Sequence, residues 1–152
     1  MKAVHNIKLS VFIHEDESFD DIKQSFLALL PFDLEKEKLK LNHIKATGAQ
    51  ENKIDILELF LQRQPHIKKF IANLLENLSP NQIQLLDKQA ESRLDPGLNF
   101  FIRLDKTQLL QDKFKLTDSG NCFHIRILIA AFPAKRDTAL TIIHNLLSPS
   151  PN

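Results

Sequence analysis

Hydrophobic and polar residues alternate along the first segment of the chain, from Val4 to His14. An apolar side chain at every second position predicts a β-strand with one buried face. An acidic cluster and Ser18 follow, and they supply the negative charge and the capping oxygen that favour a helix N-terminus. Apolar residues then recur at helical spacing from Phe19 to Leu30, so the pattern predicts a helix that ends at Pro31.

The next segment indicates a hairpin. Charged residues between Lys36 and Lys40 lead into the apolar positions Leu39, Leu41 and Ile44, and a break of phase at Asn42-His43 predicts a bulge in this second strand. Thr47-Gly48 is typical of a turn. The stretch from Lys53 to Leu61 is too short and too apolar for an isolated surface helix, so we expect a third strand here.

The remainder of the chain alternates between helical and strand patterns. Amphipathic spacing predicts one helix after Pro65 and a second from Ser79-Pro80 to the residues before Pro96-Gly97. The other predicted elements are a strand over Leu98 to Leu104, a short helix around Lys106 to Gln111, a stub strand at Phe114 to Leu116, a strand over Phe123 to Ile129 and a final helix over Ala139 to Leu147.

This order of elements predicts an α+β fold with a largely antiparallel sheet covered on one face by helices. We expect a single domain over residues 1–147 and a disordered tail over residues 148–152, where Ser and Pro alternate. No stretch approaches the ~20 apolar residues of a membrane span. The first residues lack a secretory pattern, so a cytoplasmic protein without a membrane partner is expected.

Composition limits the chemistry that the chain can perform. The three glycines are too scattered for a phosphate loop, and the six histidines do not form a metal-binding pair on one helix. We therefore predict no cofactor, no metal site, no catalytic residue and no small-molecule substrate. An enzyme that uses Cys122 with His124 ranks lowest, because a lone Cys in a strand is usually a small buried hydrophobe.

The strand from Leu98 to Leu104 carries the most informative side chains. Alternation places Phe101 and Arg103 on one side of it, and the strand from Phe123 to Ile129 places His124 and Arg126 likewise. If the two strands are antiparallel neighbours, all four side chains share a sheet face. Rings beside planar cations suit single-stranded RNA. The simpler alternative is that Arg103 pairs with Asp105 or another carboxylate on a solvated face.

Several motifs together resemble an archaeal RNA-binding domain family described as predicted exosome subunits. They are Ser92-Arg93, the run Phe101-Ile102-Arg103-Leu104-Asp105-Lys106, Leu116, Asp118-Ser119, Ile125-Arg126-Ile127, the strand that ends in His14 and the helix that stops at Leu29-Leu30-Pro31. The similarity runs along nearly the whole chain. It implies the fold of a ribosomal protein that binds 5S rRNA, and a role in RNA processing or degradation.

The resemblance and the Phe/Arg alternation give the leading hypothesis, a non-catalytic RNA-binding accessory protein. Its expected RNA contacts are Arg103, Lys106, Arg126, Phe101, Arg93 and Lys113. Arg103 is expected to be fixed by its strand, and Lys106 to act as a mobile charge at the start of a helix. The rival hypothesis is a protein-interaction module of an exosome or ribosomal assembly without RNA affinity, which suits the net charge of +1. The chain departs from the family at residues 48–54, where a polar-aromatic hairpin tip is replaced.

Overall fold

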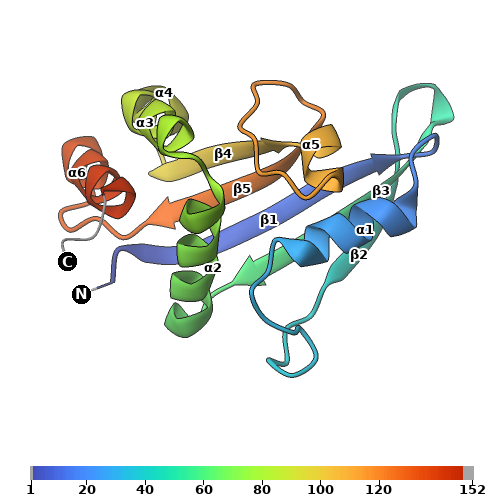
Figure 1. Ribbon diagram of the computed structural model, residues 1–152, viewed down its shortest axis with the longest axis horizontal. Coiled ribbons are helices and arrows are strands. Elements are labelled where there is room, and N and C mark those ends of the chain that lie inside the picture. Colours follow the sequence, from blue (N-terminus) through green and yellow to red (C-terminus); the bar gives the residue numbers. More distant parts are fainter. Residues whose placement is uncertain (1, 149–152) are drawn as a thin grey trace.

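The computed structural model describes residues 2–148. Helices lie over one side of an open sheet, and the amino end and the end of the last helix are close together (Figure 1). The strands are β1 (Val4–His14), β2 (Asn42–Thr47), β3 (Lys53–Leu61), β4 (Asn99–Asp105) and β5 (Cys122–Ile129). The helices are α1 (Phe19–Ala28), the 3-10 turn η1 (Ala49–Glu51), α2 (Gln64–Asn77), α3 (Pro80–Lys88), α4 (Ala90–Arg93), α5 (Lys106–Leu110) and α6 (Arg136–Leu147).

The five strands form one antiparallel sheet in the order β2-β3-β1-β5-β4. The first strand of the chain is therefore the central one, and β4 is an edge strand. One face of the sheet packs against the helices and holds the core side chains of all the inner strands. The opposite face, which we call the open face, carries the residues between them, such as Lys8 in β1 and Arg126 in β5.

Alternation along the strands produces the core. Ile7, Leu9 and Val11 of β1 are fully buried, whereas the residues between them are partly exposed. The covering helices contribute their own apolar stripes, with Phe26 of α1 and Phe70 of α2 fully buried. Burying one large apolar side chain stabilises a fold by about 1.5 to 3 kcal/mol, so this two-layer core fixes the sheet and hence the open face.

Most of the predicted elements are confirmed. The strand over Val4–His14 and the strand over Lys53–Leu61 have the predicted bounds, and Ser18 caps α1 by accepting a hydrogen bond from the Asp21 N–H. The predicted α+β class and the antiparallel sheet are also confirmed. β3 pairs with both of its neighbours in continuous register, without a bulge. Apolar residues such as Ile56 simply occupy the open face of that strand.

The prediction for the second strand is wrong at its start. β2 begins at Asn42 and pairs with β3 in continuous register, without the predicted bulge. Residues 34–38 form turns instead, and the Asp33 side chain accepts a hydrogen bond from the Lys36 N–H at 3.1 Å. A short side chain that bonds to the local backbone competes with strand pairing, and this contact explains the late start.

Two smaller predictions are also corrected. The stub strand expected at Phe114 to Leu116 is only an isolated bridge between Leu116 and Leu104. The helix expected from Ser79-Pro80 is divided at Gln89 into α3 and α4. The tail predicted over residues 148–152 lies, apart from Ser148, outside the residues that the structure describes.

Candidate functional site

The open face carries a row of four side chains that crosses four strands. Phe101 of β4 lies opposite Arg126 of β5, Arg126 lies opposite Lys8 of β1, and Lys8 lies opposite Phe60 of β3. Adjacent strands are about 4.8 Å apart, so the row spans roughly 14 Å from ring to ring. Both phenylalanines are 37% exposed. We call these four residues the cross-strand row.

A second row lies beside the first one. Arg103 of β4 is opposite His124 of β5, which is opposite Ser10 of β1. The register thus confirms that Phe101, Arg103, His124 and Arg126 share one sheet face, as the alternation of the two strands predicts. His124 also contacts Phe12, with ring centroids 5.9 Å apart.

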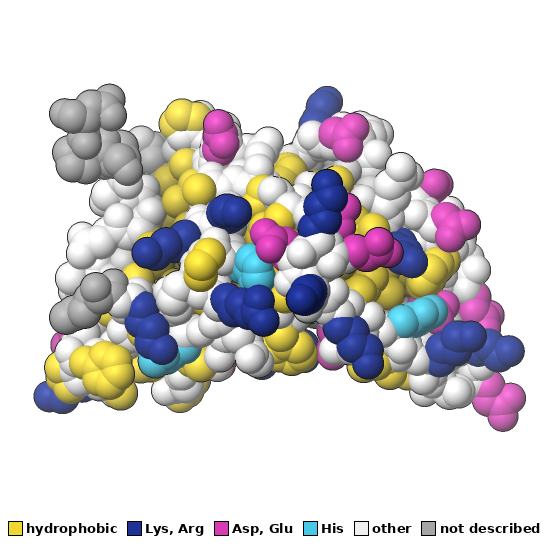
Figure 2. All heavy atoms as spheres, turned by 90° about the horizontal axis from the view of Figure 1, so that it is seen from below, with side chains coloured by type: hydrophobic (Ala, Val, Ile, Leu, Met, Phe, Trp, Pro, Cys, Tyr) yellow, Lys and Arg dark blue, Asp and Glu magenta, His cyan; other side chains and the backbone are white. Residues whose placement is uncertain are grey.

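The cations of the open face are incompletely neutralised. Within residues 2–148, no carboxylate lies within 4.0 Å of Arg126 or Arg103, and the buried Nε of Arg126 has no acceptor. Lys8 pairs with Glu58 at 3.3 Å, and its ammonium lies 5.6 Å from the centre of the Phe60 ring. Figure 2 shows the molecule from below the view of Figure 1, a side on which Lys and Arg side chains lie among acidic and exposed apolar side chains.

Lys8 and Arg126 place two like charges on directly opposite residues of the sheet, and Glu58 pairs with only one of them. Like charges on directly opposite residues of an antiparallel pair destabilise a sheet, and neither residue contributes an apolar side chain to the core. Local conflicts of this kind concentrate at functional sites, because a ligand and not the fold supplies the compensating interaction. The two cations therefore make this row a candidate surface for an anionic ligand.

Arg103 is exposed and pairs with no carboxylate of residues 2–148. Its Nη1 donates to the backbone carbonyl of Asp118 at 3.3 Å. Asp105, the partner that the simpler alternative proposed, instead caps α5 by accepting a hydrogen bond from the Gln108 N–H at 2.8 Å. The charge of Arg103 is thus held in place by a neutral oxygen and stays available.

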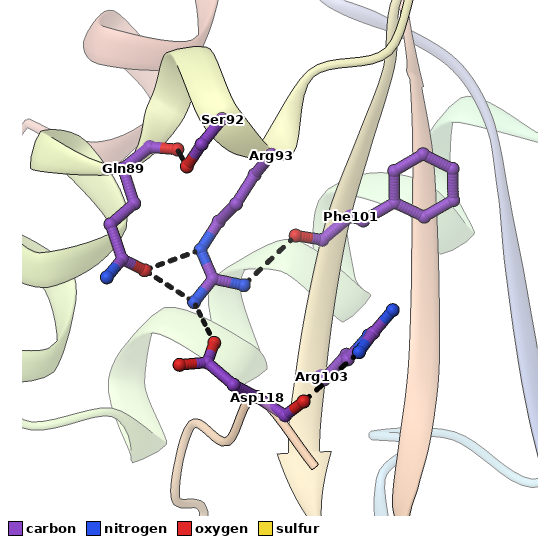
Figure 3. Close-up of a pocket in the computed structure, with 6 residues that line it drawn as sticks. All are labelled: Gln89, Ser92, Arg93, Phe101, Arg103 and Asp118. Carbon is purple, nitrogen blue, oxygen red and sulfur yellow. Dashed lines mark hydrogen bonds and ion pairs between the residues drawn. The ribbon is translucent and has the colours of Figure 1, made fainter. Parts of the chain in front are cut away.

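A pocket of about 410 Å³ lies at the outer edge of β4. Its lining residues are Gln89, Ser92, Arg93, Phe101, Arg103 and Asp118. Figure 3 shows that the first three come from the α3–α4 segment, that Phe101 and Arg103 come from β4, and that Asp118 comes from the loop before β5. The pocket joins the open face, because Phe101 and Arg103 belong to both.

Arg93 is fixed in this pocket by neutral groups. Its Nε and Nη2 donate to the Gln89 side-chain oxygen at 3.0 and 2.6 Å, and its Nη1 donates to the Phe101 carbonyl at 3.4 Å. The nearest carboxylate oxygen, from Asp118, is 3.9 Å from Nη2. Burial lowers the pKa of the Arg93 guanidinium from its ordinary value, Asp118 opposes this shift, and Arg103 adds to it.

Lys106 does not fit its predicted role as a mobile surface charge. Its side chain is only 3% exposed. The Nζ donates to the Phe12 carbonyl at 2.7 Å and to both carboxylate oxygens of Glu17 at 3.0 and 3.2 Å. Burial alone would raise the pKa of Glu17, but hydrogen bonds from the His14 N–H and from Lys106 lower it overall. All three ammonium protons are used within the protein, so we withdraw Lys106 from the expected RNA contacts.

Of the other predicted site residues, Arg93 belongs to the pocket and Lys113 does not. Arg93 lies beside Arg103 in the pocket, whereas Lys113 is an exposed residue of the loop after α5 and lines neither the pocket nor the cross-strand row. Lys8 and Phe60 were missed by the sequence reasoning. Alternation marks Lys8 as a polar position, but only the strand order shows that β1 lies next to β5.

Cys122 and His124 are brought together, as their spacing along one strand predicts. The thiol sulphur is 3.5 Å from His124 Nε2. Burial raises the pKa of the Cys122 thiol, while burial and the nearby Arg103 and Lys106 charges lower the pKa of His124. Both shifts favour the neutral pair at neutral pH, which is the opposite of the ion pair that an activated thiolate requires.

In residues 2–148, no group of three or more His, Cys, Asp or Glu side chains is arranged to hold a metal ion. None of the helices in this part of the chain combines the length and the apolar content of a bilayer span.

Comparison with known proteins gives consistent matches. The sequence model of a family described as RNA binding matches residues 6–130. RNA-binding protein PAB1135 of Pyrococcus abyssi is 27% identical over 143 residues, which are 94% of this chain and 93% of that protein. The crystal structure of protein AF2318 from Archaeoglobus fulgidus, assigned to DUF54, is similar with a TM-score of 0.84 and 26% identity, over 94% of this chain and 99% of that one. Mth689, a DUF54 protein of Methanothermobacter thermautotrophicus, shares the fold with a TM-score of 0.78 and 24% identity, over 97% and 100% of the two chains.

Proposed function

Because this chain belongs to the RNA-binding family whose model matches residues 6–130, we propose that it binds single-stranded RNA on the open face of its sheet. The observation that carries the proposal is the cross-strand row, in which two rings flank two cations. Phosphates pair with such cations, and unstacked bases stack on exposed aromatic rings. Arg103, in the second row, adds a third cation beside the first two.

The chemistry of the open face favours a single strand over a duplex. Stacking on Phe101 and Phe60 requires bases whose faces are free, and a paired helix offers only its backbone and groove edges. The three cations lie close together instead of along a long stripe, and the net charge of the whole chain is only +1. General affinity for duplex nucleic acid commonly relies on a much larger basic surface.

We also propose that the protein acts without catalysis, as an accessory to RNA processing or degradation. The neutral state favoured for Cys122 and His124 supports a binding role, and so does the function named for the family. The resemblance to predicted exosome subunits supports the link to RNA degradation.

The affinity of the Arg103→Lys variant for unstructured RNA tests the site. Lys keeps the charge but loses the planar fork, which can contact two phosphate oxygens or stack on a base. We expect binding to weaken by about 1 to 2 kcal/mol, the scale of one charge-assisted contact. Fluorescence anisotropy with a labelled unstructured RNA measures this change. The slope of log affinity against log salt should be about −0.7 for each phosphate contact.

Arg63→Lys is the matched control, because Arg63 is also exposed but precedes α2 and belongs to neither row. Its affinity should equal that of the parent, and both variants should melt at the parental temperature. Equal affinities for Arg103→Lys and the parent would remove Arg103 from the site. A parent that binds no RNA at low salt, but recovers a protein partner from nuclease-treated extract, would support the rival protein-interaction module instead.

A further inference from the structure

From the pocket at the edge of β4 we infer a binding site for one phosphate group, which Arg93 and Arg103 hold after the Asp118 carboxylate has moved away. This inference rests on the proposed function, since the ligand is a phosphate of the bound RNA. It adds a defined anion site to the flat open face. It also gives roles to Gln89, which the sequence analysis did not single out, and to Asp118, which appeared there only in the family resemblance.

Arg93 is held in the pocket by the neutral Gln89 side chain. A guanidinium has no acceptor atom, so the Gln89 amide must present its oxygen, and this oxygen accepts from both Nε and Nη2. The Arg93 side chain is 11% exposed. A buried arginine is commonly paired with a carboxylate. Here the neutral amide of Gln89 orients the guanidinium of Arg93 and does not neutralise its charge.

Arg93 and Arg103 both keep N–H donors that these contacts do not use. Three of the five N–H groups of Arg93 are used by Gln89 and Phe101. Two remain, one on each Nη atom, and the Asp118 carboxylate lies 3.9 Å from Nη2. Arg103 uses one N–H on the Asp118 carbonyl and keeps the others. Figure 3 shows Asp118 between the two arginines, reached by one through its carboxylate and by the other through its backbone.

The ion pair between Asp118 and Arg93 is weak. Its carboxylate is 3.9 Å from Arg93 Nη2, beyond hydrogen-bonding distance, and its side chain is 95% exposed. An ion pair that is so open to solvent contributes little. A phosphate can take its place at little cost, and it offers more oxygens to the two guanidiniums than one distant carboxylate does.

The location of the pocket also suits RNA. Phe101 and Arg103 line the pocket and also belong to the two rows of the open face. An RNA strand that crosses the sheet from β3 toward β4 therefore reaches the pocket at the sheet edge. One phosphate can enter it while the neighbouring base stacks on the exposed Phe101 ring.

Two substitutions of opposite effect test the site. Gln89→Glu places a carboxylate on the Arg93 fork, so we expect about tenfold weaker RNA binding, near the lower limit for one charge-assisted contact. Asp118→Asn removes the competing carboxylate and keeps its shape, so we expect about twofold tighter binding, in line with an exposed ion pair. Fluorescence anisotropy with the same labelled RNA measures both, and thermal melting checks that both variants fold.

Each variant has a control with the same change in charge. Gln84→Glu lies in α3 and is exposed, and Asp112→Asn lies in the loop after α5 at a positive φ that Asn tolerates. Neither residue lines the pocket. We expect both controls to stay closer to the parental affinity than their pocket counterparts. If each control changes the affinity as much as its counterpart, a general charge effect explains the result and the phosphate site is refuted.

The source of the phosphate is tested with two versions of the RNA, one with a 5′-phosphate and one with a 5′-hydroxyl. An equal loss with Gln89→Glu for both versions identifies an internal phosphodiester, and a loss confined to the phosphorylated version identifies a terminal phosphate. Either result supports the site. A parent that binds RNA with the same affinity as both pocket variants overturns the pocket but leaves the open face intact, whereas a parent without RNA affinity overturns the proposed function itself.

Discussion

The Lys106→Met variant is expected to lose about 2 to 3 kcal/mol of unfolding free energy. Removing one partner of a fully buried ion pair typically costs about 3 to 5 kcal/mol, and we expect less here because Glu17 keeps some access to water. Met preserves the length and the apolar stem of Lys106. It removes the donor on which the Phe12 carbonyl and the Glu17 carboxylate both rely. For a chain of this size, the midpoint of thermal unfolding should fall by about 5 to 10 °C.

The same contact gives the expected pH dependence. The pKa of Glu17 is lowered in the folded state, so the unfolded state binds the proton more readily. The stabilisation from this pair is therefore fully present above the ordinary pKa of a glutamate and is lost as the pH falls through the lowered folded value. The difference in stability between Lys106→Met and the parent should shrink over that acidic interval.

Lys113→Met is the control for this experiment, because it makes the same chemical change at an exposed loop position. Its stability should remain within about 0.5 kcal/mol of the parental value. Chemical denaturation measures both variants. Equal stabilities for Lys106→Met and the parent would show that the lysine is not a structural residue, and would return it to the list of candidate RNA contacts.

The second large effect is expected from Arg126→Glu, which should weaken RNA binding by about 2 to 4 kcal/mol. The substitution removes a charge-assisted contact worth about 1.5 to 3 kcal/mol and adds a carboxylate that repels phosphate. Arg126 occupies the centre of the cross-strand row, between Lys8 and Phe101. The fold should tolerate the change, because Glu faces Lys8 and removes an unfavourable pair of like charges.

Lys23→Glu provides the matched control, since it also reverses one charge but lies exposed on α1, over the opposite face of the sheet. Its RNA affinity should fall only slightly, through long-range repulsion that salt screens. Anisotropy titrations at two salt concentrations measure both variants. A comparable loss for the two would mean that net charge, and not the open face, controls binding.

The strands with one apolar face were the easiest part of the fold to predict. In β1, β4 and β5 the apolar residues of the alternating pattern must face the core. The residues between them therefore share the opposite face of the sheet. The grouping of Phe101 and Arg103 with His124 and Arg126 follows from that phase together with the antiparallel pairing of β4 and β5. β2 was harder, because the Asp33 side chain stabilises a local turn that competes with the strand pattern.

Contacts between distant parts of the chain could not be predicted in the same way. Lys106 meets Phe12 and Glu17, which are 94 and 89 residues away, and the local sequence shows only a lysine at the start of a helix. Lys8 joins the candidate site because β1 lies between β3 and β5, and this order depends on the packing of the whole sheet. The pocket likewise combines α3–α4, β4 and the loop at Asp118.

The central claim is that the open face binds single-stranded RNA, and an NMR titration of the isotopically labelled protein with an unstructured RNA tests it most directly. We predict that the largest shift changes occur at Lys8, Phe60, Phe101, Arg103 and Arg126, and that the exposed residues of α1 and α2 on the other side of the sheet change little. Shift changes concentrated on those helices, with an unchanged open face, would contradict the account.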